Sequence, residues 1–176
     1  MHDIRIGIIG FGAIGRFHTH SLLEGRVPGA VLSAVCDPGR LPDLVKTVPV
    51  FANALDLYTS GTCDAVVVAT PHWSHPALSI AAFAHGLHVL VEKPAGVHAA
   101  VIRTMNAAAD RAGTVYHINH TLRHQPLWRT VRNLVDEGAV GEVRRSACVA
   151  TAWFRPQCYF DTADWRALWD ALRDVF

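Results

Sequence analysis

The hexapeptide G-F-G-A-I-G directly follows the first apolar run of the chain, and it constrains the fold more than any other feature. Residues 4–9 predict a buried strand and residues 13–24 predict a helix. Between them, Gly10 permits a tight turn, Gly12 leaves the backbone open to close approach, and Gly15 lets the helix pack against the strand. The chain is therefore expected to begin with a strand, a glycine turn and a helix in mutual contact.

The N-terminus of such a helix binds phosphate, because its backbone N–H groups are free and its dipole is positive there. A glycine triplet that follows a strand and opens a helix is the fingerprint of a dinucleotide-binding loop. The alternative, in which the glycines only make turns, is disfavoured by this context. We expect the pyrophosphate to be held by the whole loop, which comprises Gly10, Phe11, Gly12, Ala13, Ile14 and Gly15.

An acidic residue at the end of the second predicted strand completes the fingerprint. Asp37 follows Gly15 by 22 residues, close to the expected spacing of about 20. Its carboxylate can accept the ribose hydroxyls of NAD and would repel the 2′-phosphate of NADP, whereas nearby Arg40 would favour that phosphate. The sequence therefore predicts NAD as the cofactor and leaves NADP open.

Short β-branched runs alternate with alanine-rich helical stretches through the first two thirds of the chain. The predicted strands are residues 4–9, 31–36, 48–51, 64–69, 88–91 and 114–118, and the predicted helices between them are residues 13–24, 41–46, 54–59, 76–84 and 97–112. Strands that are apolar on both faces and separated by helices indicate a parallel sheet covered on both sides. The fold class is therefore α/β, a doubly wound Rossmann sheet with strand order 3-2-1-4-5-6.

The pattern changes near residue 120. We predict an NAD(P)-binding domain over residues 1–120 and the start of an incomplete α+β second domain over residues 121–176. In that second part, residues 126–137 predict a helix and residues 142–154 predict a long strand. The apolar spacing within residues 165–172 predicts a further packing helix.

Charge and composition exclude several classes of partner. Lys and Arg number 16 against 15 Asp and Glu, so the net charge is +1, which disfavours nucleic acid and anionic membranes. No apolar run reaches about 18 residues, so no membrane span is expected. The four cysteines form no C-x-x-C pair and indicate reduced core thiols in a cytoplasmic protein. The histidines lack acidic or cysteine partners at ligand spacing, so no metal site is expected.

The fourth and fifth predicted strands both end in polar residues, where ligands lie in an open α/β sheet. Thr70 and Pro71 follow the fourth strand and should border the nicotinamide. His75, a little further on, either lines the site or is an exposed surface histidine, and the sequence leaves both readings open.

The fifth strand ends in V-E-K-P, and Lys93 is one of only two lysines in the chain. A lysine beside the nicotinamide can exchange a proton with a substrate, and Glu92 can orient or neutralise it. A plain surface lysine before a turn-forming Pro94 accounts for the position equally well.

These motifs together resemble the Gfo/Idh/MocA oxidoreductases. The resemblance rests on G-F-G-A-I-G, Asp37, A-T-P-x-x-x-H and G-L-H-V-L-V-E-K-P, and it extends to N-H-T-L-R-H-Q-P, G-A-V-G-E-V-R-R and W-F-R-P-Q-C-Y-F. It implies NAD(P)-dependent hydride transfer to or from a hydroxyl-bearing carbon of a small-molecule sugar, inositol or related polyol. It also implies that Lys93 is the proton-transfer group at the substrate hydroxyl.

The resemblance implies roles for residues beyond the sixth strand as well. Asn119 would lie near the nicotinamide and would join Thr70, Pro71, His75, Glu92 and Lys93 among the cofactor-binding residues. Polar contacts to the substrate would come from His120, Arg123, Arg155, Gln157 and Tyr159. Trp165–Arg166 matches a family W-R pair that approaches the cofactor.

The chain departs from the family near its end, where A-L-W-D-A-L-R-D-V-F replaces a glycine-rich stretch. We expect a truncated second domain without the family's Asp/His pair, most simply from a shifted or stopped reading frame. The same ending would also suit a split enzyme, completed by a second chain or a second copy pairing through the strand at 142–154, or a stand-alone cofactor-binding module. A catalytically inactive dinucleotide-binding protein is accordingly the alternative function.

Overall fold

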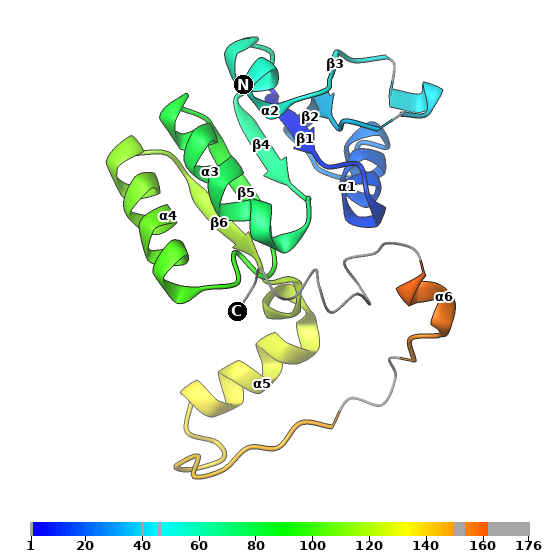
Figure 1. Cartoon of the computed structure of the whole chain (residues 1–176). Coiled ribbons are helices and arrows are strands. Elements are labelled where there is room, and N and C mark those ends of the chain that lie inside the picture. Colours follow the sequence, from blue (N-terminus) through cyan, green and yellow to red (C-terminus); the bar gives the residue numbers. More distant parts are fainter. Residues whose placement is uncertain (1, 40, 46, 150–153, 162–176) are drawn as a thin grey trace. The chain divides into compact units, whose positions relative to one another are not determined.

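The computed structural model describes residues 2–39, 41–45, 47–149 and 154–161 (Figure 1). The chain divides into two units, Met1–Asn119 and His120–Phe176, each with its own set of internal contacts.

The first unit is built on a six-stranded, all-parallel sheet of order β3-β2-β1-β4-β5-β6 (Figure 1). The strands are β1 (Ile4–Ile9), β2 (Ala30–Cys36), β3 (Val50–Phe51), β4 (Ala65–Val68), β5 (His88–Glu92) and β6 (Tyr116–Asn119). The helices are α1 (Ala13–Leu23), α2 (Ala54–Thr59), α3 (His75–Ala84) and α4 (Ala99–Ala112), with 3-10 turns η1 (Asp43–Val45) and η2 (His72–Ser74). The predicted fold class and strand order are confirmed.

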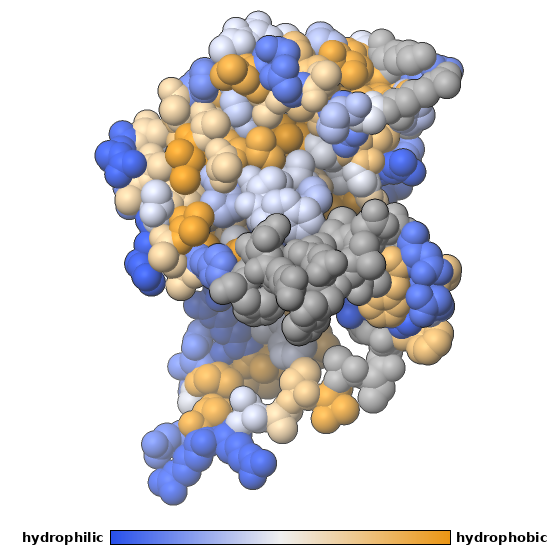
Figure 2. Space-filling view, in the orientation of Figure 1, coloured by the Kyte–Doolittle hydropathy of each residue, from blue (hydrophilic) through white to orange (hydrophobic). Residues whose placement is uncertain are grey.

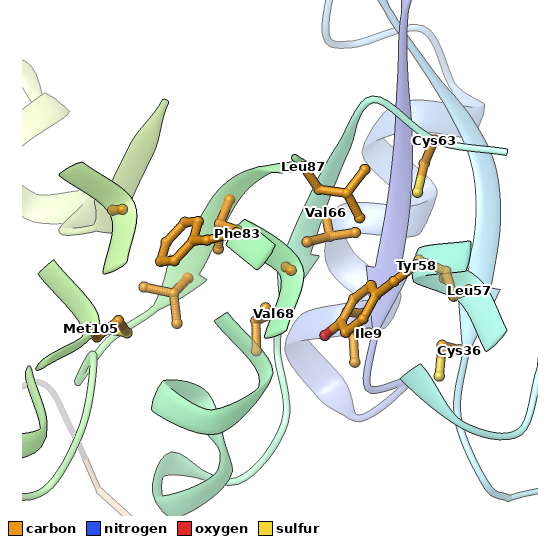
Figure 3. Close-up of a cluster of buried hydrophobic side chains, with 14 of the residues drawn as sticks. Ile9, Cys36, Leu57, Tyr58, Cys63, Val66, Val68, Phe83, Leu87 and Met105 are labelled. Carbon is orange, nitrogen blue, oxygen red and sulfur yellow. The ribbon is translucent and has the colours of Figure 1, made fainter. Parts of the chain in front are cut away.

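Helices cover both faces of the sheet because its central strands are apolar on both sides. Val66 and Val68 of β4 face the larger hydrophobic cluster, whereas Val67 between them belongs to the smaller one. The larger cluster receives Leu57 from α2, Phe83 from α3 and Met105 from α4 (Figure 3). The smaller cluster receives Leu22 from α1, together with Ile8, Phe11, Val35, Leu41 and Val45.

Local capping sets several helix ends. The Asn53 side chain accepts a hydrogen bond from the Asp56 backbone N–H at 3.0 Å and so starts α2. Gly113 ends α4 with a φ of 65°, a left-handed conformation that glycine adopts without strain. Both ends fall where the sequence predicts them.

The second unit contains a 3-10 turn, η3 (Thr121–His124), and the helices α5 (Pro126–Asp136) and α6 (Gln157–Phe160). Pro126 opens α5 at a position where its missing N–H costs nothing. The apolar side chains of α5 are partly or largely exposed. In the lower part of the space-filling view, where α5 lies in Figure 1, apolar residues appear in orange at the surface (Figure 2). The exposed apolar residues of α5 are Leu127, Trp128, Val131, Leu134 and Val135.

The predicted strand over residues 142–154 is wrong for its described part. Residues 142–149 and Phe154 are exposed and form no strand. Alternating apolar residues make a strand only when a neighbouring strand accepts their backbone hydrogen bonds, and no described segment does so here. The helix predicted over residues 165–172 lies outside the described residues.

The cysteines divide into two kinds. Cys36 and Cys63 are buried free thiols, and burial together with nearby carboxylates raises the pKa of Cys36 to about 11. Cys148 and Cys158 are free and exposed, so the expectation of core thiols is wrong for these two. No helix in the described ranges has the length and apolar character needed to cross a membrane.

Candidate functional site

The glycine loop leaves β1 and enters α1 in a geometry that only glycine allows at two positions. Gly10 has a φ of 91°, and a Cβ there would lie 2.8 Å from Thr70 Cγ2. A Cβ on Gly15 would lie 1.8 Å from the carbonyl oxygen of Gly10. These two glycines are therefore required for the turn and for the close packing of α1 against it.

Gly12 has a different reason to be glycine. It is the N-cap of α1, makes no side-chain capping hydrogen bond, and a Cβ there would meet nothing within 4 Å. No acidic side chain occupies the first turn of α1, which begins with Ala13 and Ile14. The helix therefore presents uncapped backbone N–H groups to open space, which fits the pyrophosphate of a dinucleotide.

Asp37 follows β2 and fixes the loops around it. Its Oδ2 accepts a hydrogen bond from the Phe11 backbone N–H at 2.7 Å, and its Oδ1 accepts one from the Gly39 N–H at 2.8 Å. Each carboxylate oxygen keeps a lone pair, so Asp37 can still accept ribose hydroxyls. Arg40 lies outside the described residues.

Arg16 is a residue at this loop that the sequence reasoning missed. Its Nε donates to the Phe11 carbonyl oxygen at 3.2 Å, and its guanidinium carbon lies 5.6 Å from the centroid of the Phe11 ring. A cation one residue after Gly15 could have been noticed, because phosphate loops attract arginine.

His75 is fully buried, so the reading of an exposed surface histidine is wrong. Its Nε2 lies 2.8 Å from the Thr70 carbonyl oxygen, and its Nδ1 lies 2.8 Å from the Pro94 carbonyl oxygen. Its ring therefore links the loop after β4 to the loop after β5. Both partners are carbonyl oxygens, which accept, so the imidazole is the donor in these contacts.

Thr70 and Pro71 lie at the start of the loop after β4. The Thr70 hydroxyl and the Ser74 hydroxyl share a hydrogen bond of 2.7 Å, and Pro71 precedes η2. Burial lowers the pKa of His72 in this turn, and the nearby charges of His75 and Lys93 lower it further.

The E-K-P segment ends β5 with a buried carboxylate followed by an exposed lysine. Glu92 Oε1 lies 2.8 Å from His18 Nε2 and accepts a hydrogen bond from Asn119 Nδ2 at 2.6 Å. Burial opposes ionisation of Glu92, but the hydrogen bonds from His18 and Asn119, helped by the Lys93 backbone N–H, outweigh it and lower the pKa of the carboxyl. Lys93 itself is exposed, and its peptide bond to Pro94 is cis.

Parallel pairing gathers these residues at one edge of the sheet. Gly10, Asp37, Thr70 and Lys93 follow the carboxyl ends of β1, β2, β4 and β5, and the carboxyl ends of parallel strands lie together. Asn119 ends β6 directly opposite Glu92 in the register.

The remaining candidates belong to the second unit. His120 and Arg123 lie at η3, and Gln157 begins α6. The Arg155 guanidinium carbon lies 5.2 Å from the Tyr159 ring centroid, a cation–π distance. Trp165 and Arg166 are outside the described residues. No cluster of three His, Cys, Asp or Glu suited to a metal occurs in the described part of the chain.

Comparison with known proteins agrees with this geometry. A family model named for the Gfo/Idh/MocA oxidoreductases, described as an NAD-binding Rossmann fold, matches residues 4–120. The chain is 30% identical over 172 residues to inositol 2-dehydrogenase 1 of Saccharopolyspora erythraea, a match that covers 91% of this chain and 51% of that protein. It is 26% identical over 146 residues to scyllo-inositol 2-dehydrogenase (NAD(+)) of Bacillus subtilis, covering 80% of this chain and 42% of that protein.

A solved structure extends the similarity into the second unit. The WlbA dehydrogenase of Bordetella pertussis, in complex with NADH and UDP-GlcNAcA, matches with a TM-score of 0.80 and 27% identity. That match covers 94% of this chain and 51% of the other. The chain thus spans about half the length, or less, of these relatives. The family model covers well over half of the chain and the glycine loop fits its cofactor, so the chain belongs to the Gfo/Idh/MocA oxidoreductase family with its NAD-binding Rossmann fold.

Proposed function

We propose that this protein transfers a hydride between NAD and a hydroxyl-bearing carbon of a small polyol or sugar, with Lys93 as the proton-transfer group. One observation carries the proposal: Lys93 is exposed at the same sheet edge as the glycine loop, while Glu92 before it and Pro94 after it are both held by hydrogen bonds. The inositol dehydrogenases among its relatives support the substrate class.

The chemistry divides between the cofactor and the chain. NAD, when bound, supplies the hydride acceptor in oxidation and the hydride donor in reduction. The backbone N–H groups at the start of α1 would hold its pyrophosphate, and Asp37 would hold the ribose hydroxyls. In the oxidation direction, the Lys93 amine takes the proton of the substrate hydroxyl, and in reduction it returns a proton to the carbonyl oxygen.

Substrate contacts, cofactor preference and assembly are further parts of the proposal. Substrate selection would fall to the polar residues of the second unit named above, His120, Arg123, Arg155, Gln157 and Tyr159. Arg40 would allow NADP beside NAD. The buried free thiols support a reducing compartment such as the cytoplasm, and a second copy or another chain is the proposed partner.

The reaction can be tested in the purified chain, because NADH absorbs where NAD does not. NAD with a panel of inositols and sugars should give a rising NADH band, and Lys93→Met should lower the rate by about a hundredfold or more. Lys46→Met is the matched control, since it removes the other lysine of the chain. Equal rates for the wild type and Lys93→Met would reject Lys93 as the proton-transfer group.

A dinucleotide-binding module without turnover is the second candidate. It is favoured by the location of the cofactor-binding residues, since the glycine loop and Asp37 both lie within the first unit and are joined there by a hydrogen bond. This candidate predicts NADH binding that weakens in Asp37→Ala, with no NADH formed from any polyol. Calorimetric titration with NADH separates it from a chain that binds no dinucleotide at all.

A further inference from the structure

We propose that His18 is a positioning residue, which ties the phosphate-binding helix α1 to the strand end carrying Lys93 through the carboxylate of Glu92. The inference rests on the proposed function of Lys93 and adds a residue that the glycine fingerprint and the E-K-P motif do not contain.

The contact itself is short and largely shielded from water. His18 Nε2 and Glu92 Oε1 are 2.8 Å apart, and the two side chains are only 16% and 10% exposed. The same oxygen accepts the hydrogen bond from Asn119 Nδ2 at 2.6 Å. Glu92 Oε1 is therefore a junction at which three side chains meet.

The junction joins helix α1 to the ends of β5 and β6, which are not neighbours of β1 or β2 in the sheet. His18 lies on α1, three residues after Gly15, and α1 packs on β1 and β2. Glu92 and Asn119 end β5 and β6, and β4 separates these strands from β1. The contact thus crosses the point between β1 and β4 where the strand order reverses, which is where dinucleotides bind in this class of sheet.

A carboxylate at this position has an energetic cost that must be compensated. Transfer of a charged group away from water is unfavourable unless hydrogen bonds offset it. His18 and Asn119 supply that compensation, and they also fix the direction of the Glu92 side chain. Because Glu92 and Lys93 share a peptide bond, the backbone that carries Lys93 is fixed by the same junction.

The tie also couples the two parts of the site. A shift of α1 on binding pyrophosphate would be transmitted to Glu92 through His18, and from there to Lys93. His18 therefore aligns Lys93 with the glycine loop without touching either the cofactor or the substrate.

Lysine acylation of the 176-residue chain tests this directly, because only Lys46 and Lys93 carry ε-amino groups. Trace acetylation followed by mass spectrometry gives the labelling of Lys93 relative to Lys46, with and without NADH. His18→Gln keeps an N–H near the position of Nε2, whereas His18→Asn and His18→Leu do not reach Glu92. His20→Leu is the matched control, an exposed histidine on the same helix.

In His18→Leu and His18→Asn we expect the ratio of Lys93 labelling to Lys46 labelling to change by about fivefold, because a hydrogen bond to a charged group is broken. We also expect NADH no longer to protect Lys93 from acetylation in these variants. His18→Gln should restore the ratio to within about twofold, and His20→Leu should match the wild type. If His18→Leu does not fold, His18→Asn, which remains polar, decides the result.

The proposal would be overturned if folded His18→Asn kept the wild-type labelling ratio and the wild-type protection by NADH. This holds even if that variant were less stable, because a histidine with a purely structural role would affect only the stability of the protein. The proposed reaction fails separately. If the His18 variants change the labelling ratio but the wild type oxidises no polyol, the proposed reaction is rejected and the positioning role of His18 stands. If the wild type oxidises a polyol but the His18 variants leave the labelling ratio unchanged, the reaction stands and the positioning role is rejected.

Discussion

Gly12 and Gly15 lie in the same loop, yet the backbone needs them for different reasons. A Cβ on Gly15 would collide with the carbonyl of Gly10, whereas a Cβ on Gly12 would meet only open space. Gly15 is therefore needed for folding, whereas Gly12 is the glycine that we propose to serve the bound cofactor. This difference can be measured.

Gly15→Ala should destabilise the chain by about 2–4 kcal/mol, because the turn or α1 must move to make room. Gly12→Ala should change the free energy of unfolding by only about 1 kcal/mol, as at an exposed N-cap, but should weaken NADH binding clearly. Urea unfolding followed by circular dichroism measures the first effect, and NADH fluorescence titration measures the second. Unchanged NADH affinity in Gly12→Ala would contradict the phosphate-binding assignment.

Glu92 should make stability depend on pH in the acid range. Its pKa is lowered from the usual 4.5 in the folded chain, so the unfolded chain binds more protons around that pH. The stabilisation from Glu92 is therefore complete above pH 4.5 and is lost as the pH falls through the folded pKa.

Glu92→Gln tests that dependence. The free energy of unfolding, measured with urea, should fall less in the variant than in the wild type when the pH is lowered from neutral to below 4.5. Glu142→Gln removes an exposed carboxylate and serves as the control. Parallel pH dependence in the wild type and Glu92→Gln would show that this carboxylate is not the one that titrates.

At the scale of elements, His75 holds the loops after β4 and β5 together from inside the protein. His75→Leu would remove its hydrogen bonds to the carbonyl oxygens of Thr70 and Pro94, and we expect a loss of about 2–4 kcal/mol. His85→Gln, at the exposed end of α3, should cost about 1 kcal/mol or less. Thermal and urea unfolding of both variants provide the measurement. Equal stability of the two would mean that the buried ring contributes no more than the exposed one.

The strands of the first unit are predictable because their signals are local. Residues 4–9 and 54–59 form β1 and α2 with the predicted bounds, and the other five strands differ from their predicted ranges only at their ends. The helix predicted over 41–46 is only the 3-10 turn η1, and the 3-10 turn η2 was not predicted. The predicted strand over 142–154 failed in its described part because a strand exists only beside a partner, which no local pattern supplies. Helix α5 was predicted correctly, but its spacing did not show that its apolar side chains would be exposed.

At the scale of the whole molecule, the core formed by the described residues belongs to the first unit. In the described part of the chain, the buried apolar residues all lie between Ile8 and Ala109. A fragment of residues 1–125 should therefore unfold cooperatively and bind NADH within about threefold of the full chain. Circular dichroism and calorimetric titration check both points. Loss of cooperative unfolding in the fragment would show that the second unit contributes to the core's stability.

The sequence alone predicts the parallel strands, the glycine loop and the position of Asp37. These features rest on periodicity and spacing within short stretches, where each residue's neighbours in the chain decide its conformation. The strand order was predictable because these alternating strands and helices match the doubly wound pattern. Tertiary structure decided the burial of His75 and the junction of His18, Glu92 and Asn119. The His18–Glu92 contact joins residues 74 positions apart, and the Asn119–Glu92 bond spans 27. Such contacts form only when the chain is folded, because the packing of α1 and the pairing of β5 with β6 bring their partners together.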